Sequence, residues 1–151
     1  MKLAEALQER SDLNKRIEQL KVRLENNCFV QDGETPAEDP SALLREFDGC
    51  IERLTRLTAA INRTNCGTLV DGRSLTELIA QKDCLNLKCI AYRELVNCAS
   101  QSTQRVTRTE IRYLSTVRVK DLQAQVDALS KQIRLLDNTL QENNWKTDLM
   151  D

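Results

Sequence analysis

The sequence has no histidine, few glycines and prolines, and few aromatic residues. Without histidine, Ser-His and Cys-His nucleophile pairs and histidine-based metal sites are excluded. Because only 4 Gly and 2 Pro serve 151 residues, the secondary-structure elements must be few and long. Aromatic residues make up 3% of the chain, so the core must be aliphatic, as in helices that pack along narrow stripes. The composition predicts an all-α protein with a single helical domain over residues 1–151.

An excess of basic charge is also absent, since 22 Lys and Arg face 23 Asp and Glu. Nucleic-acid-binding proteins usually concentrate positive charge on one element, so a nucleic-acid partner is not expected. No apolar run approaches the roughly 18 residues that a membrane span needs. Charged residues from Lys2 onward leave no room for an export signal. We therefore expect a cytoplasmic protein with reduced thiols and no membrane span.

The six cysteines form no C-x-x-C pair, so the common zinc and redox motifs are absent. Most of them stand where a small apolar residue would suit a helix, and we expect buried thiols that act as small hydrophobic side chains. A cluster of thiols in space is the alternative. The sequence predicts no metal and no cofactor, and the cysteines are Cys28, Cys50, Cys66, Cys84, Cys89 and Cys98.

Four long segments repeat apolar residues at spacings of three and four, which predicts helices at about 2–26, 40–64, 74–101 and 119–143. The last of these has the most regular heptad pattern. Segment 74–101 carries apolar residues on several faces, so we expect it to be the most buried helix.

Capping signals support these boundaries. Asp39-Pro40 predicts an N-cap followed by a proline in the first helical turn. Ser74 and Glu77 have the spacing of a capping box. Asn26-Asn27 is expected to end the first helix, and Gly67, after the second, can take the left-handed conformation of a helix end.

Segment 105–117 is rich in Thr and has no helical stripe, so it predicts a short extended or β-like insert. Four helices of similar length predict an antiparallel, up-down four-helix bundle. The alternative is two coiled-coil hairpins whose stripes are completed by another subunit. In both cases the narrow stripes of 2–26 and 119–143 favour a homo-oligomer.

Polar residues gather near the helix ends in two places, which we interpret as ligand-binding candidates. In an up-down bundle, one end would collect Asn62, Arg63, Asn65, Asp71, Arg73 and Trp145, and the opposite end Arg105, Arg108 and Glu110. Arginines beside a helix N-terminus can bind an anion, such as a nucleotide or RNA. The alternative is that the Asn and Asp side chains cap helices.

The sequence contains no catalytic constellation. Its four glycines are too scattered for a phosphate-binding loop. Acidic residues such as Glu5 and Glu9 lie on polar helix faces, whereas helical magnesium sites place carboxylates on facing helices. We predict that the protein is not an enzyme, has no catalytic residues, and is a self-associating interaction or structural protein with a protein partner. An anion-binding module is the alternative.

Several runs are similar to a small bacterial family, the septicolysin-like proteins. The runs are M-K-L-A-E-A-L-Q-E-R at 1–10, E-D-P at 38–40, I-N-R-T-N at 61–65, D-G-R-S-L-T-E-L-I-A at 71–80, R-T-E-I at 108–111, S-T-V at 115–117 and N-W-K-T-D-L at 144–149. The resemblance implies a functionally uncharacterised, intracellular helical protein, and the family label implies a cytolysin. It supplies no catalytic residues.

Overall fold

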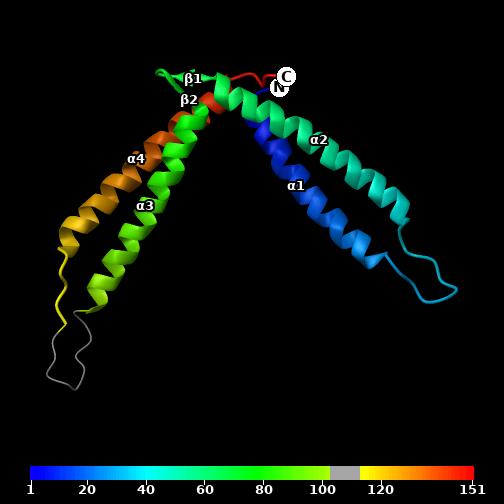
Figure 1. The fold of residues 1–151 in the computed structure, drawn as a ribbon, viewed down its shortest axis with the longest axis horizontal. Coiled ribbons are helices and arrows are strands. Elements are labelled where there is room, and N and C mark those ends of the chain that lie inside the picture. The colour runs from blue at the N-terminus through cyan, green and yellow to red at the C-terminus, as the bar shows by residue number, and fades with distance from the viewer. Residues whose placement is uncertain (103–112) are drawn as a thin grey trace. The chain divides into compact units, whose positions relative to one another are not determined.

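A computed structural model describes residues 1–102 and 113–151 of the chain. Over these ranges the chain forms four α-helices and one small antiparallel sheet, which confirms the all-α prediction (Figure 1). The elements are α1 (Leu3–Asn26), α2 (Pro40–Gly67), β1 (Leu69–Val70), β2 (Arg73–Ser74), α3 (Leu75–Ser102) and α4 (Val119–Lys146). Every helix boundary lies within three residues of the boundary predicted from the sequence.

The chain divides into two compact units. Unit 1 comprises Met1–Val70 and Asn143–Asp151, and unit 2 comprises Asp71–Glu142. Unit 1 therefore contains α1, α2, β1 and the last residues of α4, while unit 2 contains β2, α3 and most of α4. That the whole chain behaves as a single domain stays a prediction.

In unit 1, α1 and α2 pack as an antiparallel hairpin. The ion pairs between them show the antiparallel direction, because the second residue number falls as the first rises: Glu9–Arg53, Arg16–Glu46 and Arg23–Glu38. Between the helices lie side chains that are almost fully buried, among them Leu20, Leu57 and Ile61. The apolar stripe of α1 is thus covered by α2 of the same chain.

The loop between α1 and α2 is fixed at both ends. The Asp39 carboxylate accepts a hydrogen bond of 3.0 Å from the Ser41 amide, with Pro40 in the first helical turn, as predicted. At the other end, the buried Asn27 follows the last residue of α1. Its Nδ2 donates to the Arg23 carbonyl at 2.8 Å, and its Oδ1 accepts from the Glu38 amide at 3.0 Å. Asn27 therefore ends the helix and holds the loop against it.

The two ends of the chain pair with each other in unit 1. Lys2 and Asp148 form an antiparallel β-bridge, and their side chains form an ion pair of 2.8 Å. The amide of Leu3 donates to the Thr147 carbonyl at 2.9 Å. On the other side of the bridge, the amide of Leu149 donates a hydrogen bond to the Met1 carbonyl, also at 2.9 Å. We call this pairing, residues 1–3 with 147–150, the terminal clasp.

The terminal clasp lies against the end of α2. The Met150 amide donates to the fully buried Thr64 hydroxyl at 2.9 Å, and that hydroxyl donates to the Ala60 carbonyl at 2.8 Å. A Cβ at Gly67 would lie 3.0 Å from Met150 Cε. Gly67 does not have a positive φ, so it does not take the left-handed conformation that the sequence suggested. Glycine here gives the tail room to approach the helix.

In unit 2, α3 and α4 also run antiparallel. Lys82 Nζ lies 2.6 Å from the Asp137 carboxylate, and further along α3 the Arg93 guanidinium donates to the Ser130 hydroxyl at 2.8 Å. The apolar core between the helices contains Cys89, Val96, Val126 and Leu129, flanked by Leu85, Tyr92, Val119, Leu122 and Ile133. The heptad stripe of 119–143 therefore packs against α3.

The small sheet joins the two units in sequence. Asp71 (φ 50°) and Gly72 (φ 82°) both have positive φ, which is the backbone of a tight two-residue hairpin turn. After the turn, the Ser74 amide donates to Glu77 at 2.7 Å and the Glu77 amide donates to the Ser74 hydroxyl at 3.2 Å, which confirms the capping box. Of the predicted insert at 105–117, residues 105–112 lie outside the described residues, and 113–117 contain neither helix nor strand.

Candidate functional site

Helix α3 has two apolar stripes on opposite sides. The stripe that packs against α4 includes Leu85, Cys89, Tyr92 and Val96. Two residues after each of these comes a member of a second stripe, and two residues correspond to a rotation of about 200° around a helix. We call this second stripe the outer face of α3, and it consists of Cys84, Leu87, Lys88, Ala91, Glu94, Leu95 and Cys98, with Ile90 at its edge about 100° around the helix from Ala91, all of them exposed.

The outer face is more apolar than a solvated helix surface. The exposed fractions are 68% for Leu87, 52% for Ile90 and 42% for Leu95. The prediction that this helix is the most buried one is therefore wrong, because α4 covers only one of its two stripes. Single exposed apolar residues are ordinary, whereas several that repeat along one face of a helix mark an interaction surface.

The charged residues of the outer face have few contacts within the chain. The Lys88 ammonium lies 5.5 Å from the centre of the Tyr92 ring. Across residues 1–102 and 113–151, neither Lys88 nor Glu94 takes part in an ion pair. Beside its leucines the face thus presents one positive and one negative group that form no ion pair within the described residues.

The cysteines are more exposed than predicted. Only Cys89 is buried, Cys50 is half-buried, and the remaining four are exposed: Cys28, Cys66, Cys84 and Cys98. The expectation of mostly buried thiols is wrong, because Cys84 and Cys98 lie on the side of α3 that α4 does not cover, Cys28 lies in the loop after α1, and Cys66 lies at the end of α2. No group of three or more Cys, Asp or Glu in the described ranges could hold a metal ion.

Among the predicted ligand-binding residues, Arg63 lies in a groove. The groove runs along α2 and is lined also by Arg53 and Arg56, with Leu149 and Asp151 from the C-terminal tail. Arg53 binds Glu9 through two hydrogen bonds of 2.6 and 2.7 Å, which raise the pKa of the guanidinium and lower the pKa of the carboxyl. Arg56 lies 3.4 Å from Glu52.

Arg63 differs from its two neighbours in the groove. Its side chain is exposed, and within the part of the chain that the structure describes it forms no ion pair or hydrogen bond. A guanidinium in this state can bind a carboxylate or phosphate through two parallel hydrogen bonds. Asp151 in the same groove is the acidic group that would compete with such a ligand.

The other predicted site residues have more local surroundings. In unit 1, Asn62 is exposed, Asn65 is half-buried and Trp145 is 53% exposed near the end of α4. In unit 2, Asp71 occupies the hairpin turn, and the Arg73 guanidinium donates to the Gln81 side chain at 2.7 Å. These positions fit the alternative that the polar residues order turns and helix ends. Arg105, Arg108 and Glu110 lie outside the described residues.

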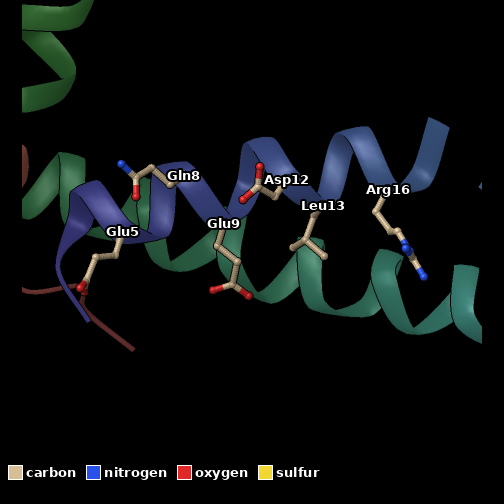
Figure 2. Close-up of a pocket in the computed structure, with 6 residues that line it drawn as sticks. All are labelled: Glu5, Gln8, Glu9, Asp12, Leu13 and Arg16. Carbon is tan, nitrogen blue, oxygen red and sulfur yellow. The ribbon is translucent and has the colours of Figure 1, made fainter. Parts of the chain in front are cut away.

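An open pocket also runs along the exposed side of α1. Figure 2 shows its lining side chains spread over about three helical turns: Glu5, Gln8, Glu9, Asp12, Leu13 and Arg16. The acidic groups already have partners. Glu5 accepts a hydrogen bond of 2.6 Å from the Lys2 amide, and Glu9 is held by Arg53. The pocket thus lacks the free, convergent carboxylates that acid–base chemistry or cation binding needs.

A search of the described residues for a helix long and apolar enough to span a membrane finds none. This agrees with the short apolar runs of the sequence.

Comparison with known proteins identifies the relatives of this chain. A family model described as a family of unknown function (DUF6847) matches residues 10–149. A crystal structure of a functionally unknown conserved protein from Corynebacterium diphtheriae has a TM-score of 0.94 and 33% sequence identity, and the match covers 99% of each chain. No curated protein matches the sequence.

These matches correct the resemblance drawn from short motifs. Neither match is to a septicolysin-like family, so that assignment is wrong, and the cytolysin activity that the label alone suggested has no support. Short runs such as D-G-R-S-L-T-E encode a turn and a capping box, and similar physical demands produce similar letters in unrelated helical proteins. The match over residues 10–149 shows that the chain belongs to DUF6847, a family of unknown function.

Proposed function

We propose that the protein is a non-enzymatic helical interaction protein that self-associates through the outer face of α3. The observation that supports this is the second apolar stripe on a helix whose first stripe is already packed against α4. Covering Leu87, Ile90 and Leu95 removes apolar surface from water, which is the main driving force of protein association.

This interface differs from the one expected from the sequence, which used the stripes of 2–26 and 119–143. Those stripes are engaged within the units, since Leu20 is fully buried in the α1–α2 hairpin and Leu129 belongs to the α3–α4 core. Replacing Leu129 and Ile133 with Asp would therefore unfold a hairpin instead of separating subunits. The outer face of α3 is an apolar surface that neither hairpin covers, and it is the one we assign to a partner.

The absence of catalysis and the compartment are parts of the same proposal. The sequence provides no histidine, and the carboxylates of the α1 pocket are bound to partners within the chain. Exposed free thiols at Cys28, Cys84 and Cys98 suit a reducing environment, which supports a cytoplasmic protein.

Light scattering on a sizing column tests the proposal with two matched variants. Leu87→Glu places a charge on the outer face of α3, whereas Leu135→Glu makes the same change at an exposed leucine of α4, where 54% of the residue is accessible. We expect an oligomer for the wild type and for Leu135→Glu, and a folded monomer for Leu87→Glu. A wild-type monomer at all concentrations, or an oligomer that Leu87→Glu leaves intact, would refute the proposed interface.

A second candidate function, supported by the unpaired Arg63, is binding of a phosphorylated anion in the α2 groove. The test is a thermal-shift measurement with inorganic phosphate and with nucleoside triphosphates. A ligand present at 100 times its dissociation constant would stabilise the fold by about 2.7 kcal/mol. Arg63→Gln should abolish the shift, while Arg45→Gln, at an exposed arginine elsewhere on α2, should retain it. No shift in the wild-type protein would exclude this function.

A further inference from the structure

The outer face of α3 has a sequence that is nearly symmetric about Ala91. Lys88 lies three residues before Ala91, and Glu94, which has the opposite charge, lies three residues after it. Four residues before and after stand Leu87 and Leu95. Residues three and four apart lie on the same side of a helix, so these positions belong to one surface.

The symmetry extends one helical turn further. Seven residues before and after Ala91 stand Cys84 and Cys98, and both are exposed. At the centre, Ala91 is small and exposed, so it offers no bulk that would keep a second helix away. The outer face is therefore complementary to a copy of itself turned through 180°.

We propose that the partner of the outer face is a second copy of this chain, bound with the two α3 helices antiparallel and a twofold axis at Ala91. This inference rests on the proposed self-association and adds its geometry. A twofold interface uses the same surface on both subunits, so a residue before the axis contacts the residue equally far after the axis on the partner. Lys88 then faces Glu94 of the other copy, and Leu87 faces Leu95.

Charge selects this direction over the parallel one. A parallel pair in the same register would separate Lys88 from Glu94 of the other copy by about 9 Å along the helix axes, because the two residues are six positions apart, so the opposite charges would not lie level with each other. The antiparallel pair contains two Lys88–Glu94 contacts instead, beside two Leu87–Leu95 contacts. An unrelated protein partner would not require the face to be symmetric about one residue.

Thiol cross-linking measures the geometry directly. In a background with Cys28, Cys50 and Cys66 replaced by Ser, and with Cys89 buried, one variant carries C84S and keeps Cys98, and another carries C98S and keeps Cys84. In the proposed pair, Cys84 faces Cys98 of the other copy, within the roughly 8–10 Å between packed helix axes. The two copies of Cys98 are about 21 Å apart, because 14 residues of helix separate them along the axis.

A short bis-maleimide is added to each variant alone and to an equal mixture of both. We expect a covalent dimer in the mixture and little in either variant alone. Dimers in each variant alone would show the parallel arrangement, and an uncross-linked mixture that remains an oligomer by light scattering would show another interface; each result overturns this inference but not self-association. A monomer by light scattering overturns both.

Charge reversal provides a test that does not depend on the cysteines. K88E alone and E94K alone should each weaken dimerisation at least tenfold, because each places like charges together at both symmetric contacts. The double variant K88E/E94K should restore it, since the contacts are again between opposite charges. If the double variant dimerises more weakly than both single variants, while circular dichroism shows unchanged helical content, the proposed pairing is wrong.

Discussion

The two units hold their helices together in different ways. Unit 1 combines a buried apolar core with three ion pairs between α1 and the α2 region, and with the terminal clasp. In unit 2, an apolar cluster packs between α3 and α4, with the Lys82–Asp137 ion pair as a polar contact between the two helices.

The difference indicates where a partner can bind. In unit 1, ion pairs flank the α1–α2 core and the terminal clasp lies against the end of α2, although apolar residues such as Leu44 and Ile51 are exposed on α2 as well. In unit 2, α3 uses one apolar stripe for α4 and leaves the other exposed at Leu87, Ile90 and Leu95. The free apolar surface of unit 2 is what supports a role in association.

The largest expected effect is on the apolar cluster of unit 2. Leu129→Ala should destabilise the α3–α4 hairpin by about 2–5 kcal/mol, because it removes buried methyl groups and leaves a cavity. The readout is hydrogen exchange, with faster exchange expected in α3 and α4. Leu135→Ala, at an exposed leucine of the same helix, should change stability by less than about 0.5 kcal/mol. Equal effects would show that the cluster does not hold unit 2 together.

The next effect concerns the terminal clasp of unit 1. Thr64→Val removes the acceptor of the Met150 amide and leaves that donor unpaired, which should cost about 1–3 kcal/mol. The matched control is Thr55→Val, because the Thr55 hydroxyl makes the same bond to the carbonyl four residues back and is exposed. Hydrogen exchange at Leu149 and Met150 should accelerate in Thr64→Val alone. Unchanged exchange there would mean that Thr64 does not anchor the tail.

A smaller effect is expected at the capping box of unit 2. Ser74→Ala should destabilise α3 by about 1 kcal/mol. The pKa of Glu77 is lowered first by the hydrogen bond from the Ser74 amide and then by the bond from the Ser74 hydroxyl. Since alanine keeps the amide, an NMR titration of Ser74→Ala should show the pKa of Glu77 rising only part of the way to its ordinary value. A full return would show that the hydroxyl dominates.

The smallest effects are those of the ion pairs. Hydrogen bonds from Arg53, Arg23 and Lys2 lower the pKa values of Glu9, Glu38 and Asp148, all in unit 1. A carboxyl with a lowered pKa in the folded state stabilises the fold above its unfolded pKa, and this stabilisation is lost as pH falls through the folded pKa.

The melting temperature of the protein should therefore fall as the pH drops below about 4, the ordinary pKa range of these carboxyls. Glu9→Gln should flatten this dependence, and added salt should weaken it, because the pairs are exposed. Thermal melts between pH 7 and pH 3 measure both effects. A pH dependence that Glu9→Gln leaves unchanged would show that the Glu9–Arg53 pair does not contribute.

The sequence predicted the helices well because helix formation depends on local patterns. Apolar spacing located all four helices, and Asp39 and Ser74 marked two of their starts. The terminal clasp was missed because it pairs residues from opposite ends of the chain, and no local pattern reports such a contact. Gly67 illustrates the same limit, since a side chain at this position would crowd Met150, which is distant in sequence.

The candidate site was harder to predict than the fold. Both stripes of α3 have helical spacing, and only the position of α4 decides which of them is buried. The polar residues at 62–73 were a poor guide, because Asp71 and Arg73 serve a turn and a local hydrogen bond, and only Arg63 of that stretch lines the α2 groove. The useful signal was the excess of apolar residues in segment 74–101, which we had interpreted as burial.

The most direct test of the account is the rate at which the wild-type thiols react with an alkylating reagent at increasing protein concentration. If the outer face of α3 is the interface, Cys84 and Cys98 should react quickly in dilute protein and at least tenfold more slowly once dimers form. Cys28, which is exposed in unit 1, should react quickly throughout. Rates for Cys84 and Cys98 that do not depend on concentration, in a sample that light scattering shows to be oligomeric, would contradict the account.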